Sequence, residues 1–126
     1  MSIANPYLRT LCRLFPDRGY GEGFPRWADS PVDMPCYSHS NGSAMRTGPI
    51  DWAFITLPEG LRDAGHCAVV THNHEEGIKA AQAVAVAVFF LARNSSPKYA
   101  IKSYISATFG YNSGQIPGSE PPGLCL

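Results

Sequence analysis

The sequence lacks an excess of charge of either sign, because ten lysine and arginine residues balance ten aspartate and glutamate residues. Charged residues make up only 16% of the chain. Proteins that capture nucleic acid through its phosphates generally present a basic face, so this composition gives no direct nucleic-acid signal. The hydrophobic share of 44% is ordinary and indicates a globular chain rather than a disordered one.

Cysteine is scarce and poorly spaced for a metal site. The chain has four cysteines, which form no CxxC pair and fit no zinc pattern: Cys12, Cys36, Cys67 and Cys125. The first residues contain asparagine, proline and arginine where the apolar stretch of a secretory signal would lie. We therefore predict free thiols, a reducing compartment and a cytoplasmic location.

The chain also lacks a long hydrophobic run and any stretch with the alternation of a β-strand. Its longest apolar run, Ala80–Ala92, is too short to span a bilayer and contains Gln82, so no membrane association is predicted. A length of 126 residues suits one domain. We predict an all-α fold, a compact single-domain helical bundle with the Ala80–Ala92 run in a buried central helix.

Capping residues and apolar spacing predict the helices individually. They are expected from Asn5 to Phe15, over Phe24–Ala28, after Pro49, from a Thr56 capping box to Val70, from Asn73 or His74 onward, and from Ser96-Pro97 to Gly110. The central helix should bury one face: Ile78, Ala81, Ala85, Val88, Phe89 and Ala92. Residues 112–126 are rich in glycine and proline and have no period, so we predict a domain over 1–111 and an irregular tail.

Four segments carry a family resemblance: PDRGYGEGFPRW, NGSAMRTGPIDWAF, THNHEEGIKAAQAVA and FGY. Their order and approximate spacing are those of the ADP-ribosylglycohydrolase family, the dinitrogenase-reductase-activating type of ADP-ribosylhydrolase. The chain resembles this family from Tyr7 to Tyr111. One such match would mean little, but four in order are specific. The resemblance implies the helical architecture of the middle part of that enzyme fold.

The resemblance also shows which chemistry is missing. Enzymes of the family are longer and hold a pair of magnesium ions through Gly-Asp, Thr-Asp-Asp and Asp-x-Asp-Thr motifs. None of these occurs here: no acidic residue precedes Asp17, and Glu120 is the only one after Glu76. Magnesium favours an octahedral oxygen shell with carboxylates. We therefore predict no metal ligands, no cofactor and no catalytic residues, with magnesium relevant only if missing segments or a second chain complete the site.

The resemblance places a ligand-pocket-like site on two segments. Its residues are Asn41, Gly42, Ser43, Met45 and Arg46, together with His72. In the family the first segment lines the ADP-ribose pocket and the first histidine of THNH faces it. Backbone N–H groups of a tight turn can point at a diphosphate, and an arginine can fork onto a phosphate. This chain departs from the family in having Ser40 for the usual glycine and Glu75 for the usual proline.

A structural interpretation of the same residues stays open. The Asn-Gly turn would lead into a helix, with Arg46 tied to a carboxylate. In THNH, polar side chains would satisfy free N–H groups at a helix start, and Glu75 and Glu76 would suit the positive end of the helix dipole. The cluster of Ser38, His39, Ser40 and Ser43 indicates no nucleophile–base pair, because short runs of this kind are common in loops.

These observations favour a non-catalytic binding protein derived from an ADP-ribosylglycohydrolase. Its partner would be a protein, with only weak ADP-ribose binding, and a phage or mobile-element inhibitor of the anti-CRISPR type is one such role. The alternative is an ADP-ribosylhydrolase that removes ADP-ribose from a modified protein side chain, either without magnesium or completed by further segments or a second chain. An inactive gene remnant is a third interpretation.

Overall fold

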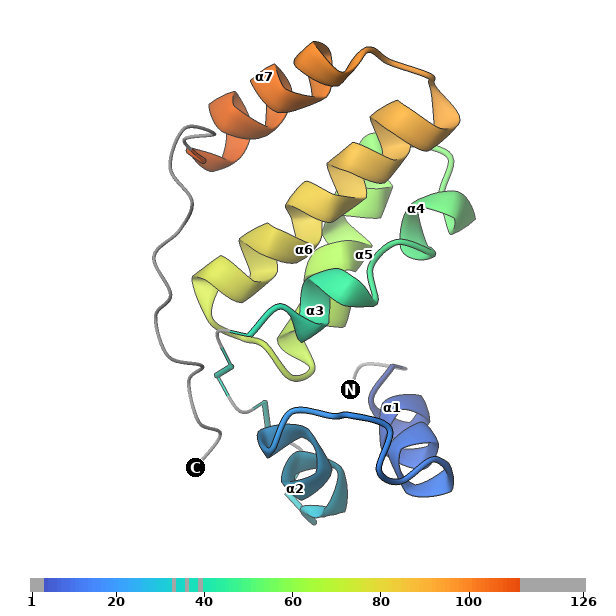
Figure 1. Cartoon of the computed structure of the whole chain (residues 1–126), viewed down its shortest axis with the longest axis vertical. Coiled ribbons are helices and arrows are strands. Elements are labelled where there is room, and N and C mark those ends of the chain that lie inside the picture. Colours follow the sequence, from blue (N-terminus) through green and yellow to red (C-terminus); the bar gives the residue numbers. More distant parts are fainter. Residues whose placement is uncertain (1–3, 33, 36, 39, 112–126) are drawn as a thin grey trace.

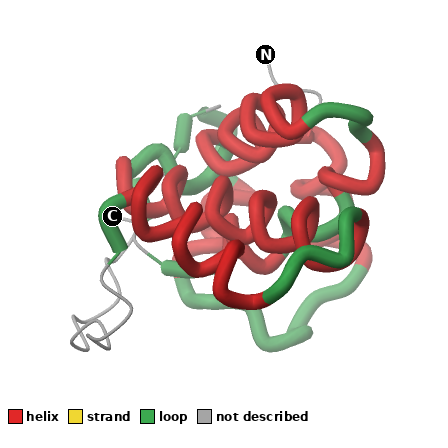
Figure 2. The backbone as a smooth tube through the Cα atoms, turned by 90° about the horizontal axis from the view of Figure 1, so that it is seen from above, coloured by secondary structure: helices red, strands yellow, loops and turns green. Residues whose placement is uncertain are grey.

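The structure, a computed structural model, describes residues 4–32, 34–35, 37–38 and 40–111. These residues form helices joined by loops and contain no strand, which confirms the all-α, single-domain prediction. In Figure 1, α6 runs through the middle with α5 behind it, α7 lies above, and α1 and α2 lie below. Figure 2 shows the same helices from above. None of the described helices is long and apolar enough to cross a membrane.

Every predicted helix is present, with small shifts at the ends. The elements are α1 (Ala4–Leu14), α2 (Gly23–Asp29), α3 (Gly42–Met45), α4 (Ile50–Ala53), α5 (Leu57–Val69), α6 (Glu75–Val88), a π-helical turn η1 (Phe89–Arg93) and α7 (Lys98–Phe109). At the start of α5 the carboxylate of Glu59 accepts from the Thr56 backbone N–H at 3.2 Å, as the capping box predicts. Gly110 ends α7 in the left-handed conformation, with a φ of 73°.

One prediction from the sequence is wrong, and others concern residues that the structure does not describe. Asn5 does not cap α1 but lies in its first turn, where its Oδ1 accepts from Nε of Arg9 at 2.9 Å. Cys12 and Cys67 are free, as expected. Cys36, Cys125 and the predicted tail over 112–126 lie outside the described residues, so the tail and the domain boundary stay predictions.

Small side chains let α5 and α6 pack closely. The buried residues of these helices are Gly60, Ala64, Gly65 and Ala68 on α5 and Gly77, Ala81, Ala85 and Val86 on α6. A Cβ on Gly65 would lie 3.3 Å from Nε2 of Gln82, so the side chain of Gln82 occupies the space beside this glycine. Gln82, the polar residue in the apolar run, donates to the carbonyl of Leu61 at 3.2 Å. The close approach therefore leaves this amide satisfied.

The predicted inward face of α6 is only partly right. Ala81 and Ala85 are fully buried, but Val86 is the fully buried valine and Val88 is only half-buried. A helix that is apolar on all sides does not reveal its innermost face by periodicity. After Val88 the backbone also changes to the π-helical turn, which alters the direction of the following side chains.

The pair α1–α2 has its own small core. Cys12, Trp27 and Ala28 are buried there together with Val70 from the end of α5. Arg9 lies over the Trp27 ring at 4.5 Å and donates to the carbonyls of Ala28, Ser30 and Val32, so it fixes the chain that follows α2. Four large apolar residues on α1 and directly after it remain exposed, and we call them the α1 stripe: Tyr7, Leu11, Leu14 and Phe15.

Candidate functional site

The two segments that the sequence assigned to one pocket lie in contact. Gly42 begins α3, and a Cβ built on it would lie 3.2 Å from Cε1 and 3.3 Å from Nε2 of His72. Only glycine leaves the imidazole this much room without a shift of the ring. His72 itself is 5% exposed and follows the end of α5. The loop around the start of α3 and the turn at Thr71–His72 therefore form one site.

A chain of hydrogen bonds joins these segments. Oγ of Ser38 is 2.9 Å from Oγ of Ser40, which in turn lies 2.8 Å from Nε2 of His72. On the other side of the ring, Nδ1 is 2.6 Å from Oγ1 of Thr71, and Nη2 of Arg46 donates to that oxygen at 2.8 Å. The sequence indicated no nucleophile–base pair in this run of serines, and that stays a prediction; the structure places the hydroxyl of Ser40 within hydrogen-bond distance of His72. Ser40 and His72 are 32 residues apart in sequence, so only the fold brings them together.

Arg46 is held by the end of α5. Its Nη2 donates to the carbonyl of Cys67 at 2.7 Å and to that of Ala68 at 3.5 Å, in addition to Thr71. The last carbonyls of a helix lack partners within the helix and favour a cation. The expected tie to a carboxylate is therefore wrong, because main-chain oxygens take its place. Nε of Arg46 is buried and has no partner among the described residues.

The remaining predicted pocket residues have different positions. Ser43 is fully buried and donates from Oγ to the carbonyl of Gly77 at 2.9 Å, which fixes α3 to the start of α6. Asn41 is exposed and makes no side-chain cap. Met45 is 79% exposed and lies outside this polar network. Of the predicted set, Gly42, Arg46 and His72 lie together, and a ligand role for the set stays a prediction.

The imidazole of His72 is neutral near pH 7. Burial, and secondarily the nearby charge of Arg46, lowers the pKa of His72 to about 4. A neutral imidazole carries one donor and one acceptor nitrogen. The tautomer of His72 therefore decides which of its two neighbours donates a hydrogen bond and which accepts one.

The glutamates of the THNHEE segment have partners of their own. His74 caps α6, with Nδ1 accepting from the N–H of Glu76 at 3.2 Å, which confirms one of the two predicted caps. Nζ of Lys79 lies 2.8 Å from Glu75 and 3.1 Å from Glu76. The hydrogen bond from Lys79 lowers the pKa of Glu75. Among the described residues no three His, Cys, Asp or Glu side chains are grouped to hold a metal ion.

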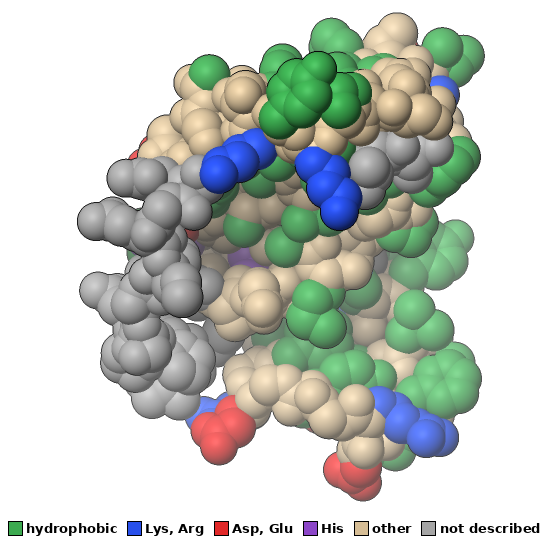
Figure 3. All heavy atoms as spheres, turned by 45° about the horizontal axis from the view of Figure 1, so that its top comes forward, with side chains coloured by type: hydrophobic (Ala, Val, Ile, Leu, Met, Phe, Trp, Pro, Cys, Tyr) green, Lys and Arg blue, Asp and Glu red, His purple; other side chains and the backbone are tan. Residues whose placement is uncertain are grey.

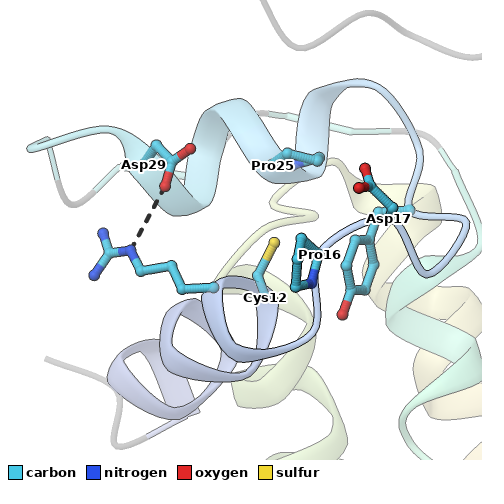
Figure 4. A pocket seen from close by; sticks show the side chains of 7 residues that line it. Cys12, Pro16, Asp17, Pro25 and Asp29 are labelled. Atoms are coloured by element: carbon cyan, nitrogen blue, oxygen red, sulfur yellow. Dashed lines mark ion pairs between the residues drawn. The ribbon is translucent and has the colours of Figure 1, made fainter.

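A cavity of about 320 Å³ lies elsewhere, between α1 and α2. Figure 4 shows its lining, which is Cys12, Arg13, Pro16, Asp17, Tyr20, Pro25 and Asp29. Nε of Arg13 lies 3.5 Å from Asp29 across one end. Burial, and secondarily Asp29, raises the pKa of Cys12, so its thiol stays protonated and is a poor nucleophile. None of the predicted pocket residues lines this cavity.

Comparison with known proteins identifies the stretch that carries the site. Residues 7–117 match the family model described as ADP-ribosylglycohydrolase. No curated protein and no solved structure matches the chain. The matched range contains the four segments noted in the sequence and the contact between Gly42 and His72.

Proposed function

The chain belongs to the ADP-ribosylglycohydrolase family, and from this premise we propose that it is a binding protein that does not cleave ADP-ribose linkages. The observation that carries the proposal is the state of Arg46. The cation that would fork onto a phosphate is bound to the Cys67 carbonyl at 2.7 Å and to Thr71 at 2.8 Å. In the family this segment lines a ligand pocket, but here its arginine binds main-chain and hydroxyl oxygens of the same chain.

The energetic consequence is weak affinity for ADP-ribose. Nη2 of Arg46 is already engaged by its oxygen partners, so a phosphate that displaced them would leave buried polar groups unpaired, at a cost of about 1–3 kcal/mol each. His72 likewise already contacts Ser40 and Thr71. We expect any remaining binding to be roughly millimolar, which corresponds to about 4 kcal/mol.

A protein partner is supported by the surface of α1. Each residue of the α1 stripe is about half exposed or more, from 49% for Phe15 to 68% for Tyr7. Clustered exposed apolar residues commonly mark protein–protein interfaces, and aromatic anchors carry much of their binding energy. In Figure 3, hydrophobic side chains reach the surface in several groups. A narrower form of the proposal is an inhibitor of a host protein, of the anti-CRISPR type, for which no individual residue argues.

The test is capture of a partner by matched variants. Wild type, Leu11→Ser/Leu14→Ser, Arg46→Ala and Tyr99→Ser would each be used as bait, after melting curves confirm that they fold. Tyr99 is 74% exposed on α7 and serves as the control for loss of an exposed apolar residue. We expect only the α1 stripe variant to lose the partner that wild type captures. Loss of the partner by the Arg46→Ala variant alone would mean that the site around Gly42, Arg46 and His72 binds the partner.

The alternative function is ADP-ribosylhydrolysis, and one observation favours it. Gly42 and His72, from the two segments that line the ligand pocket in the family, lie in contact here, as a ligand pocket would require. The test is release of ADP-ribose from a modified arginine with and without magnesium. Magnesium at a hundredfold excess over its dissociation constant would stabilise the native state by about 2.7 kcal/mol. Release of ADP-ribose, together with a higher melting temperature in magnesium, would place the enzyme first.

A further inference from the structure

Ser40 combines two properties that a reactive serine needs. The residue is exposed, and its Oγ lies 2.8 Å from Nε2 of a nearly buried histidine. The far nitrogen of that histidine, Nδ1, is held at 2.6 Å by Oγ1 of Thr71. A hydroxyl, a base and a group that orients the base are therefore linked by consecutive hydrogen bonds. This arrangement activates serine nucleophiles.

The direction of the protons follows from Ser38. This residue is 5% exposed, and its Oγ already accepts from the N–H of Ser40 at 3.2 Å. Within the described chain, the acceptor within reach of its own hydrogen is Oγ of Ser40, at 2.9 Å. Buried hydroxyls rarely leave a donor unused. We therefore adopt the tautomer in which Ser40 donates to Nε2 of His72 and Nδ1–H donates to Oγ1 of Thr71.

We propose that Ser40 is a nucleophile that accepts acyl groups from small activated carboxylic esters, with His72 as its base. Oγ of Ser40 bonds to the carbonyl carbon while its hydrogen moves to Nε2 of His72. The bond from that carbon to the alcohol oxygen breaks, and the departing alcohol takes the proton from Nε2. Water then attacks the Ser40 ester, His72 takes its proton and returns it to Oγ, and the carboxylic acid leaves.

The surroundings define the substrate class and the pace of the reaction. Ser40 is exposed and lies beside the small residues Ser38 and Gly42, so we expect short acyl groups to reach its hydroxyl. Arg46, whose charge reaches the imidazole, opposes the imidazolium that must form during proton transfer. We expect acylation to be slow and to need a good leaving group. Thr71 and Arg46 are positioning residues, because they act through His72.

The experiment uses p-nitrophenyl acetate on the full chain, with release of nitrophenolate and peptide mass mapping as readouts. The acetyl group should appear on the peptide that contains Ser40. Ser40→Ala should abolish that label, and Ser40→Cys should restore acylation through its thiol. Ser103→Ala removes an exposed serine on α7 and should change nothing. His72→Gln should slow acylation on the order of 10²-fold, the lower range for a general base.

A second measurement protects the test against misfolded variants. The ¹⁵N shifts of the His72 ring in wild type should show hydrogen on Nδ1 and an unprotonated Nε2, and Thr71→Val should mix the two tautomers and slow acylation while the melt stays cooperative. The proposal is wrong if the label falls on other residues equally in wild type and Ser40→Ala. It is also overturned if Nε2 carries the hydrogen, because His72 could then not take the proton of Ser40.

Discussion

The α5–α6 contact and the α1–α2 pair differ in how completely they bury what they carry. Between α5 and α6 the contact is made by glycine, alanine and one fully buried valine, and the polar Gln82 is satisfied across it. On α1 and directly after it, by contrast, the four large apolar side chains of the α1 stripe remain exposed. The α1 stripe therefore leaves apolar surface that a partner could cover, whereas the buried residues of the α5–α6 contact do not.

The largest expected effect separates the two valines of α6. Val86 is fully buried, whereas Val88 is half-buried. Val86→Asp would place an unpaired charge in the α5–α6 region at a cost of several kcal/mol, which is comparable to the whole stability of a small domain. We expect Val86→Asp to be unfolded by circular dichroism and Val88→Asp to be destabilised but folded. The reverse order would mean that the interior of α6 is assigned to the wrong side.

The next effect is the pH dependence of stability near His72. The pKa of His72 is lowered from 6.5 to about 4 in the folded protein. Between these two pH values the imidazole is therefore protonated in the unfolded chain but neutral in the folded one. Stability should therefore be constant above about pH 6.5 and fall as pH drops toward 4, by up to about 3 kcal/mol.

A matched variant separates His72 from the carboxylates that titrate in the same range. The difference between wild type and His72→Gln in urea melts should grow smaller as the solution is acidified. A wild-type slope that survives His72→Gln would assign the effect to other groups.

A smaller effect concerns the glycine at the start of α6. A Cβ on Gly77 would lie 3.0 Å from Cβ of His72 and 3.3 Å from the carbonyl oxygen of Ser38. Although alanine is the better helix former, Gly77→Ala should destabilise the protein by about 1–3 kcal/mol through this crowding. The control is Gly48→Ala, where a Cβ meets nothing within 4 Å. Equal melting temperatures for both variants would show that the site has room to relax.

The smallest effect belongs to the open region. Leu14 is 65% exposed on the α1 stripe, so Leu14→Ser should change the free energy of unfolding by no more than about 0.5 kcal/mol. A clearly lower denaturation midpoint would show that the α1 stripe is part of the core, and the contrast between the two regions would then fail.

Much of the fold could be predicted from the sequence, because local signals mark the helices. The Thr56–Glu59 capping box and Gly110 gave helix ends, and His74 was one of two expected caps. The innermost face of α6 could not be predicted, since the helix is apolar all round. The exposure of α1 was also missed, because an amphipathic pattern says which face is apolar but not whether anything covers it.

The sequence named residues that the fold brings near one another, but not the bonds between them. Gly42, Arg46 and His72, which the family resemblance placed in one ligand pocket, lie near one another, and their ligand role stays a prediction. The partners of Arg46 are main-chain carbonyls, which no side-chain pattern announces. The contact between Ser40 and His72 depends on how the chain folds over 32 residues, so residue spacing carries no signal for it.

The central claim is that the inherited pocket is closed by its own side chains, and calorimetry with ADP-ribose tests it most directly. The titration would use wild type, Arg46→Ala and His72→Ala, each with and without magnesium. We expect no binding tighter than roughly millimolar in any of them, while the captured partner still binds. Micromolar binding by wild type that either substitution abolishes would contradict the claim and show that Arg46 and His72 hold a ligand.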